Sequence, residues 1–315
     1  MSDRVVTIFG GSGFLGRYVV RDLAKDGWRI RVAVRRPNEA LFLRPMGEVG
    51  QIELIQANLR DEPSIARAIE DSGAVINLVG ILHEGGHQSF EEIHIHGPAR
   101  IAAAAAKAGV RRLVHVSAIG ADEESTSAYG RSKAAGERAL KSECPDATIL
   151  RPSVLFGPED HFFNRFANLA RYSPALPLIG GGSTRLQPAY VGDVGQAIQR
   201  SLDDPASPGR IYELGGPRIY TFRELMELVL RLTDRRRLLI SVPFALAKLQ
   251  GVLLGLLPNP PLTLDQVRLL ENDNIASPSL PDFGALGLAP HTAEAILPTY
   301  LFRFRPGGLK MERTA

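Results

Sequence analysis

This sequence of 315 residues contains a single cysteine and carries little net charge. Cys144 is the single cysteine, which excludes an intrachain disulfide, a thiolate cage for zinc and an iron–sulfur cluster, and favours a reducing compartment. The 37 Lys and Arg exceed the 34 Asp and Glu by only three charges, so nothing points to a nucleic-acid partner. The calculated pI near 9.1 still favours weak contact with an anionic membrane surface.

Long hydrophobic runs are also lacking, with one partial exception. The stretch Leu238–Leu257 is strongly apolar, but Pro243, Lys248 and Gln250 interrupt it. We therefore predict a buried or interfacial helix and not a membrane span. Simple packing inside a small domain and docking on a membrane or partner are both open, and the arginines at 235–237 would suit anionic lipid.

The first half of the chain alternates short β-branched runs with helical stretches. Apolar runs joined by helices indicate parallel strands that are buried on both faces, as in a doubly wound α/β sheet of the Rossmann type. The expected strands are Val5–Phe9, Arg31–Val34, Ile52–Gln56, Ala74–Leu78, Leu113–Ser117 and Thr148–Leu150, and the expected helices are Gly13–Lys25, Asp61–Asp71, Gly97–Ala108 and Tyr129–Ser142.

The pattern changes after Arg151, where Pro and Gly become frequent and helical stretches such as Asp160–Tyr172 and Phe222–Leu232 are separated by loops. We predict a Rossmann domain over residues 1–155 and a smaller, interleaved C-terminal α/β lobe over 156–290. Residues 291–315 are expected to form a partner-binding tail that is an extended arm from Tyr300 onward.

A glycine-rich turn directly follows the first expected strand. Glycines at this point let the backbone turn tightly and approach a pyrophosphate, which the amino terminus of the next helix then binds. The turn predicts a dinucleotide site that includes Gly10, Ser12, Gly13, Phe14, Leu15 and Gly16.

The residues at the next strand ends indicate which nucleotide binds. Arg35 and Arg36 stand where an acidic residue would select NAD(H). Two guanidinium groups would pair with a 2′-phosphate, so NADP(H) is favoured over NAD(H), although solvated surface arginines are the alternative. Further cofactor-binding candidates follow the third and fourth expected strands, namely Asn58, Leu59, Leu78, Val79 and Gly80.

Ser117 ends a strand, and Tyr129 and Lys133 follow on one face of a helix. A nearby ammonium should lower the pKa of the Tyr129 phenol and prepare it for proton exchange. Ser117 could hold a substrate oxygen, and Lys133 could bond the nicotinamide ribose even without chemistry. The sequence shows no Ser-His-Asp arrangement and no nucleophile elbow, which argues against hydrolase chemistry.

In these motifs the chain resembles the extended, epimerase-like short-chain dehydrogenase/reductase superfamily. A stretch that begins at Arg151-Pro152-Ser153-Val154 and continues through Phe156-Gly157-Pro158-Glu159-Asp160 narrows the resemblance. It is similar to the atypical branch that includes the nucleotide-binding accessory subunit of respiratory complex I and its bacterial relatives. Pro152 and Val154 complete the expected cofactor-binding set.

The resemblance implies an accessory subunit that contacts the peripheral arm of complex I and holds NADPH mainly as a structural ligand. Ser117, Tyr129 and Lys133 would then be retained without an established reaction. A free-standing NADP(H)-dependent reductase or epimerase, linked to ubiquinone metabolism, is the alternative. With no leader sequence evident, the expected location is the cytoplasmic face of a bacterial inner membrane, or the mitochondrial matrix side after processing.

Histidines gather in one segment, between the fourth expected strand and the following helix. A glycine pair makes the segment irregular and no carboxylate completes a zinc motif, so we predict no metal site. Surface or loop side chains are the favoured interpretation, although the segment could cover the nicotinamide. The four are His83, His87, His94 and His96.

Overall fold

The computed structural model describes residues 4–258 and 260–307. The chain forms two compact units that interleave along the sequence. The first contains the described residues up to Pro152, together with Val191–Leu214 and Ser277–Leu288. The second contains Ser153–Tyr190 and the described residues of Gly215–Ala276 and from Ala289 onward.

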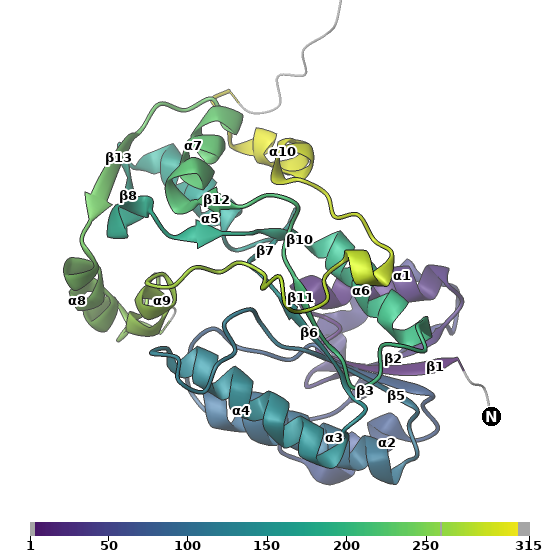
Figure 1. Cartoon of the computed structure of the whole chain (residues 1–315). Coiled ribbons are helices and arrows are strands. Elements are labelled where there is room, and N and C mark those ends of the chain that lie inside the picture. Colours follow the sequence, from purple (N-terminus) through teal and green to yellow (C-terminus); the bar gives the residue numbers. More distant parts are fainter. Residues whose placement is uncertain (1–3, 259, 308–315) are drawn as a thin grey trace, which may run out of the picture. The chain divides into compact units, whose positions relative to one another are not determined.

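A seven-stranded parallel sheet forms the centre of the first unit (Figure 1). Its order is β11-β6-β5-β4-β1-β2-β3, and the strand order reverses between β1 and β4, which is where sheets of this type bind ligands. The predicted Rossmann-type sheet is confirmed. The strands are β1 Val5–Phe9, β2 Arg29–Val34, β3 Ile52–Gln56, β4 Ala74–Asn77, β5 Arg112–Val116, β6 Thr148–Pro152 and β11 Ile211–Leu214.

Helices cover both faces of this sheet (Figure 1). On one face α1 (Phe14–Lys25) packs against α6 (Val191–Asp203), and on the other lie α2 (Glu62–Ile69), α3 (Gly97–Lys107) and α4 (Ala128–Glu143). Ala102 and Ala105 of α3 are buried in the core. Because these side chains are small, α3 can lie close to the sheet. Further helical segments are η1 Pro37–Met46, η2 Glu91–His96 and η4 Gly284–Leu286.

The second unit is built from short two-stranded sheets and helices around an aromatic core that includes Phe156, Phe163 and Phe222. Its strand pairs are β7 Leu155–Phe156 with β10 Ala189–Tyr190, β9 Arg185–Leu186 with β12 Tyr220–Thr221, and β8 Ala175–Ile179 with β13 Leu238–Val242. Its helices are α5 Phe163–Tyr172, η3 Gly180–Gly182, α7 Phe222–Leu232, α8 Phe244–Leu254, α9 Leu264–Leu269, α10 Ala293–Ile296, α11 Pro298–Leu301 and η5 Phe302–Phe304.

The apolar stretch Leu238–Leu257 is not one helix, so that prediction is wrong. It begins as β13, which pairs in parallel with β8, and then continues as α8. Pro243 separates the two because it caps the start of α8 and has no N–H to continue a ladder. Within the described residues, no helix has the length and apolar character needed to cross a membrane.

The expected extended arm from Tyr300 onward is also wrong where the structure describes it. Residues 300–304 lie in α11 and η5, and Tyr300 and Leu301 are buried. Tyr300 is held because its hydroxyl donates to Asp160 Oδ2 at 2.5 Å. Residues 308–315 of the predicted tail lie outside the described residues.

Candidate nucleotide site

The glycine-rich turn leaves β1 at the point where the strand order reverses. Gly10 has a φ of +80°, which a residue with a side chain rarely adopts. Its carbonyl accepts from the N–H of Gly13 at 3.0 Å, which closes the turn. A Cβ at Gly16 would lie 2.4 Å from the Gly10 oxygen, so only glycine lets α1 start this close to the turn.

The amino terminus of α1 lies beside this turn and has no side-chain cap. Gly13 is the N-cap residue and offers no side chain to the first helical N–H groups. Ser12 and Phe14 are half-buried around it, and Leu15 is buried. Uncapped amides at a helix start bind an anion well.

The end of β4 lies directly against the glycine turn. The Leu78 N–H donates to the Phe9 carbonyl at 2.9 Å, and a Cβ at Gly10 would approach the Val79 nitrogen to 3.2 Å. A Cβ at Gly80 would lie 3.9 Å from Lys133 Nζ. The structure thus brings the three residues after β4 between the glycine turn and Lys133.

The two arginines after β2 are exposed but have different partners. Arg36 Nη1 forms an ion pair with Glu39 Oε1 at 2.9 Å. Arg35 faces the carboxamide of Gln88, in the loop after β4. Beyond β3, Asn58 is exposed and Leu59 is buried. All these residues lie at the carboxyl edge of the sheet, where the sequence predicted a ligand.

Ser117, Tyr129 and Lys133 come together where β5 ends beside α4. Ser117 is buried, and its Oγ has no hydrogen-bond partner in the described structure. Lys133 Nζ donates to the Val116 carbonyl at 3.0 Å, next to Ser117. Ser127 caps α4 by accepting from the Gly130 N–H, which fixes the helix start that carries Tyr129. A buried hydroxyl without a partner offers a position at which a polar group of a ligand could bind.

The pKa values of this group differ from the expectation. Burial raises the pKa of the Tyr129 phenol to about 12, so the predicted lowering is wrong. Burial also lowers the pKa of Lys133 to about 8, although the Glu137 carboxylate acts in the opposite direction. A phenol shifted upward keeps its proton at neutral pH and is a poor base.

His94 belongs to the interior of the site, which corrects its interpretation as a surface or loop histidine. Its side chain is 2 % exposed. Nε2 accepts from the Ile81 N–H at 3.1 Å, so Nδ1 carries the proton and faces Ser132 Oγ at 2.8 Å. The ring stacks on Phe90 and meets Tyr129 edge-on. Burial, with Lys133 nearby, lowers the pKa of His94 to about 3, so the imidazole is neutral.

Further buried polar residues near Lys133 were missed by sequence reasoning. Asn77 is fully buried and pairs with His115 Nδ1 at 3.1 Å, while its Oδ1 accepts from the Val79 N–H. This bond fixes the loop after β4. Neither residue carries a sequence signal, because each sits inside an apolar strand and finds its partner on a neighbouring strand.

A buried ion-pair chain continues from α4 into the sheet. Arg151 binds both carboxylate oxygens of Glu137, at 2.9 and 2.7 Å, and reaches Glu213 at 3.3 Å. Both carboxylate residues are buried. Glu213 also accepts from the Ser277 N–H at 2.8 Å, so the chain ties α4, β6, β11 and the segment from Ser277 into the first unit.

Two of the predicted residues stand at the end of β6 and beyond it. Pro152 is the last residue of β6, and its carbonyl accepts from the Ile119 N–H at 3.1 Å. Val154 belongs to the second unit, where its carbonyl accepts from the Ala189 N–H at 3.0 Å.

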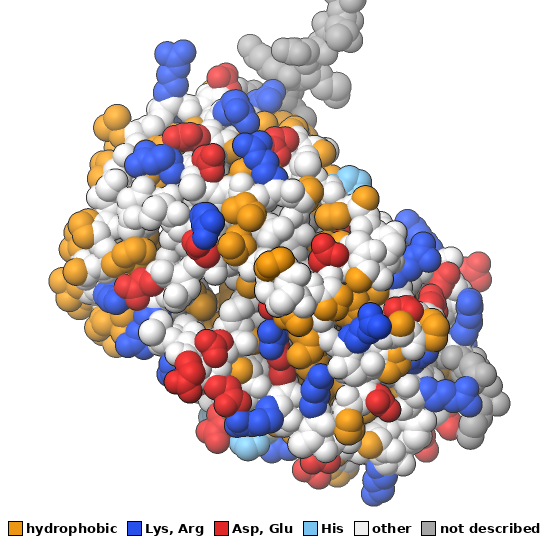
Figure 2. All heavy atoms as spheres, viewed as in Figure 1, with side chains coloured by type: hydrophobic (Ala, Val, Ile, Leu, Met, Phe, Trp, Pro, Cys, Tyr) orange, Lys and Arg blue, Asp and Glu red, His pale blue; other side chains and the backbone are white. Residues whose placement is uncertain are grey.

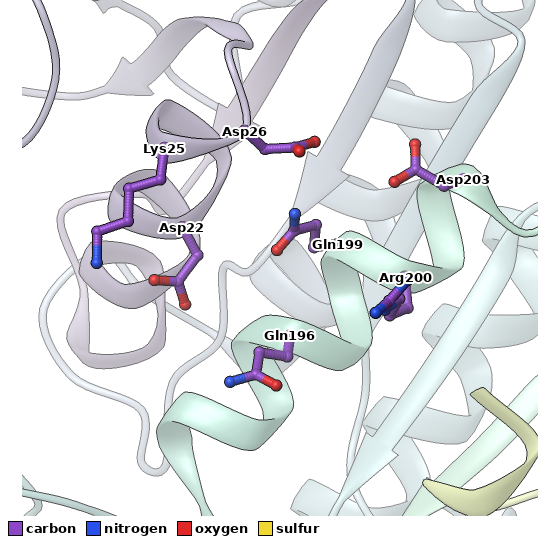
Figure 3. A pocket seen from close by; sticks show the side chains of 7 residues that line it. All are labelled: Asp22, Lys25, Asp26, Gln196, Gln199, Arg200 and Asp203. Carbon is purple, nitrogen blue, oxygen red and sulfur yellow. The ribbon is translucent and has the colours of Figure 1, made fainter. Parts of the chain in front are cut away.

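A polar groove between α1 and α6 is distinct from this site (Figure 3). Its lining has no apolar wall of the kind that nucleotide rings require. Nor, among the described residues, does any group of three His, Cys, Asp or Glu side chains come close enough to hold a metal ion. The groove is lined by Asp22, Lys25, Asp26, Gln196, Gln199, Arg200 and Asp203.

Comparison with known proteins identifies a family to which the chain belongs and several similar proteins. Residues 6–215 match the model of the NAD dependent epimerase/dehydratase family. The chain is 37% identical to the mitochondrial NADH dehydrogenase (ubiquinone) 1 alpha subcomplex subunit 9 of Arabidopsis thaliana, over 98% of this chain and 80% of that protein. The protein of the same name from Mus musculus is also 37% identical, over 93% of this chain and 78% of its own length.

A bacterial enzyme and a solved structure are also similar. The ceramide reductase of Caulobacter vibrioides is 34% identical over 76% of this chain and 74% of that protein. The dTDP-glucose 4,6-dehydratase DesIV of Streptomyces venezuelae, solved with NAD and TYD bound, has a TM-score of 0.73 at 20% identity, covering 95% of this chain and 96% of that one. The structural likeness supports the fold alone.

Proposed function

The chain belongs to the NAD-dependent epimerase/dehydratase family, and we propose that it is an NADP(H)-binding accessory subunit of respiratory complex I. The bound nucleotide would be mainly structural and would support assembly and stability. The observation that carries the proposal is the 37% identity to a complex I subunit over 98% of this chain. Its partners would be subunits of the peripheral arm.

The residues of the first unit fit a nicotinamide dinucleotide. The uncapped start of α1 and the turn at Gly10 would hold the pyrophosphate. Arg35 and Arg36 would face the 2′-phosphate, and the adenine side would be flanked by Asn58 and Leu59. Leu78, Val79 and Gly80 would follow the nucleotide toward the nicotinamide end.

The nicotinamide end would lie beside the polar residues at the end of β5. The buried, unpartnered Ser117 hydroxyl is suited to a polar group of a ligand. Lys133 would bond the ribose, and Pro152 would line the site. Val154 remains a proposed cofactor-binding residue.

An exposed apolar surface of the second unit supports a peripheral position at the inner membrane. Figure 2 shows hydrophobic side chains gathered over α8. We define the α8 face as the exposed aliphatic side chains of α8 and of the turn that follows it, of which Leu253 is 62 % and Leu256 is 83 % exposed. Apolar patches of this kind mark contact surfaces, and we propose that this one rests on anionic lipid. Its members are Leu246, Leu249, Val252, Leu253, Leu256 and Leu257.

Co-purification from native membranes tests the assignment. A tagged chain expressed at its natural level should migrate with NADH:ubiquinone oxidoreductase activity on a native gel, and deleting the chain should lower the amount of assembled complex. A tagged chain found entirely as a separate soluble protein, with complex I unchanged on deletion, would contradict the proposal.

A free-standing NADP(H)-dependent reductase or epimerase that is linked to ubiquinone metabolism is the second candidate. It is favoured by the intact Ser117, Tyr129 and Lys133 set and by the similarity to a ceramide reductase. In that case the nicotinamide supplies hydride when bound, and the Tyr129 hydroxyl gives its proton to the reduced oxygen.

Replacing Tyr129 with Phe separates the two functions. If the chain is a structural subunit, Tyr129→Phe should leave nucleotide content and complex assembly unchanged. If the chain is a reductase, the same variant should bind nucleotide normally but lose a reductase rate that the wild type shows with a carbonyl substrate.

A further inference from the structure

Arg35 and Arg36, the two arginines after β2, differ in whether a neighbouring carboxylate offsets their charge. Arg36 pairs with the Glu39 carboxylate, which offsets its charge. Arg35 instead meets the neutral Gln88. With its carboxamide oxygen facing Arg35, Gln88 accepts from both terminal guanidinium nitrogens, at 2.5 and 3.2 Å. Over the described part of the chain Arg35 makes no ion pair with a carboxylate. No neighbouring negative charge therefore offsets the positive charge of its guanidinium group.

Gln88 is held in place by the loop that follows β4. Gly85 and Gln88 bond each other twice through their backbones, each N–H donating to the other carbonyl at 3.0 Å. The Phe90 N–H donates to Glu84 Oε1 at 2.7 Å. At its start the loop is fixed to His94 by the Ile81 N–H. These hydrogen bonds hold the loop in one conformation, in which the Gln88 carboxamide faces Arg35.

We propose that Gln88 is a specificity-determining residue of the nucleotide site, because it orients the uncompensated Arg35 guanidinium toward the 2′-phosphate of NADP(H). The inference rests on the proposed nucleotide binding. Arginine has five N–H donors, so donors that Gln88 does not use can bind phosphate oxygens. A neutral acceptor restricts the side chain without cancelling its charge, which lowers the entropic cost of binding.

Replacing Gln88 with Glu tests the role of charge, and replacing it with Ala tests the role of orientation. We would measure Kd for NADPH and for NADH from nucleotide fluorescence, and the NADPH dissociation rate by displacement. Gln88→Glu should reduce the NADPH-over-NADH preference at least tenfold, about the effect of one lost charge-assisted hydrogen bond. Gln88→Ala should weaken NADPH binding by roughly threefold to tenfold, mainly by faster dissociation, and should spare NADH.

The matched control is Gln196→Glu, which makes the same change of charge on α6 at an exposed position and should leave both Kd values unchanged. If the wild type prefers NADPH and Gln88→Glu keeps that preference, the role of Gln88 is wrong while the proposed function stands. If the wild type binds neither nucleotide or prefers NADH, both are wrong.

Discussion

Replacing Gly16 with Ala should damage the nucleotide site through backbone geometry alone. The added Cβ would lie 2.4 Å from the Gly10 oxygen and 2.5 Å from the Gly11 oxygen, while ordinary contact begins at 3.4 Å. Helix α1 and the turn would have to separate by about 1 Å. We expect a loss of roughly 1–3 kcal/mol in the free energy of unfolding, as for other overpacked sites.

The same displacement should move the amides of the α1 amino terminus away from the pyrophosphate. We expect NADPH affinity to fall at least tenfold, which corresponds to about 1.4 kcal/mol. Isothermal titration calorimetry on the nucleotide-stripped protein would measure the affinity, and urea titration the stability.

A second glycine in a helix of the same unit provides the control. A Cβ at Gly195 in α6 would meet its nearest neighbour, Asp22 Oδ2, at an ordinary 3.4 Å. Gly195→Ala should therefore raise stability by roughly 0.5–1 kcal/mol and leave NADPH binding unchanged. Wild-type affinity in Gly16→Ala would refute the reasoning that places the phosphates at this turn.

Three further outcomes are expected. Arg151→Met should lower the free energy of unfolding by about 3–5 kcal/mol in urea titrations at pH 7, because it leaves the buried Glu137 and Glu213 carboxylates without their cation; a loss under roughly 1 kcal/mol would mean that the pair is exposed in solution. Lys133 has a folded-state pKa of about 8 against an ordinary 10.5, so the unfolded chain binds the extra proton between these values and the stability of the nucleotide-free protein should rise with pH there. Lys133→Met should abolish that rise and be more stable than wild type at pH 7, and an unchanged pH profile would argue against a buried ammonium. Leu253→Glu on the α8 face should reduce sedimentation with vesicles containing phosphatidylserine without affecting nucleotide content, whereas wild-type sedimentation would remove the α8 face from membrane contact.

The sheet of the first unit could be predicted largely from the sequence. Strands β1 to β6 are short apolar runs separated by helical stretches, and the glycine turn marks the end of β1. Strand β11 was not expected, because it follows a long segment that belongs partly to the other unit. The break between β13 and α8 was also missed, since both parts are equally apolar and only Pro243 separates them.

The polar interior of the site could not be predicted, because its contacts join residues far apart in sequence. His94 and Ser132 are 38 positions apart, and the two residues meet only because α4 packs beside η2 through Gly136. A Cβ at Gly136 would lie 1.8 Å from the His94 carbonyl oxygen. Arg35 and Arg36 are likewise equivalent in sequence, and only the structure shows that one faces an amide and the other a carboxylate.

The most direct test is to identify the nucleotide that the native protein carries. The chain would be purified from its natural membranes, denatured in acid-free solvent, and the released small molecules identified by mass and quantified against protein. We expect NADP(H) in stoichiometric amount. Release of NAD(H) in its place, or of no dinucleotide at all, would contradict the proposed NADP(H) binding.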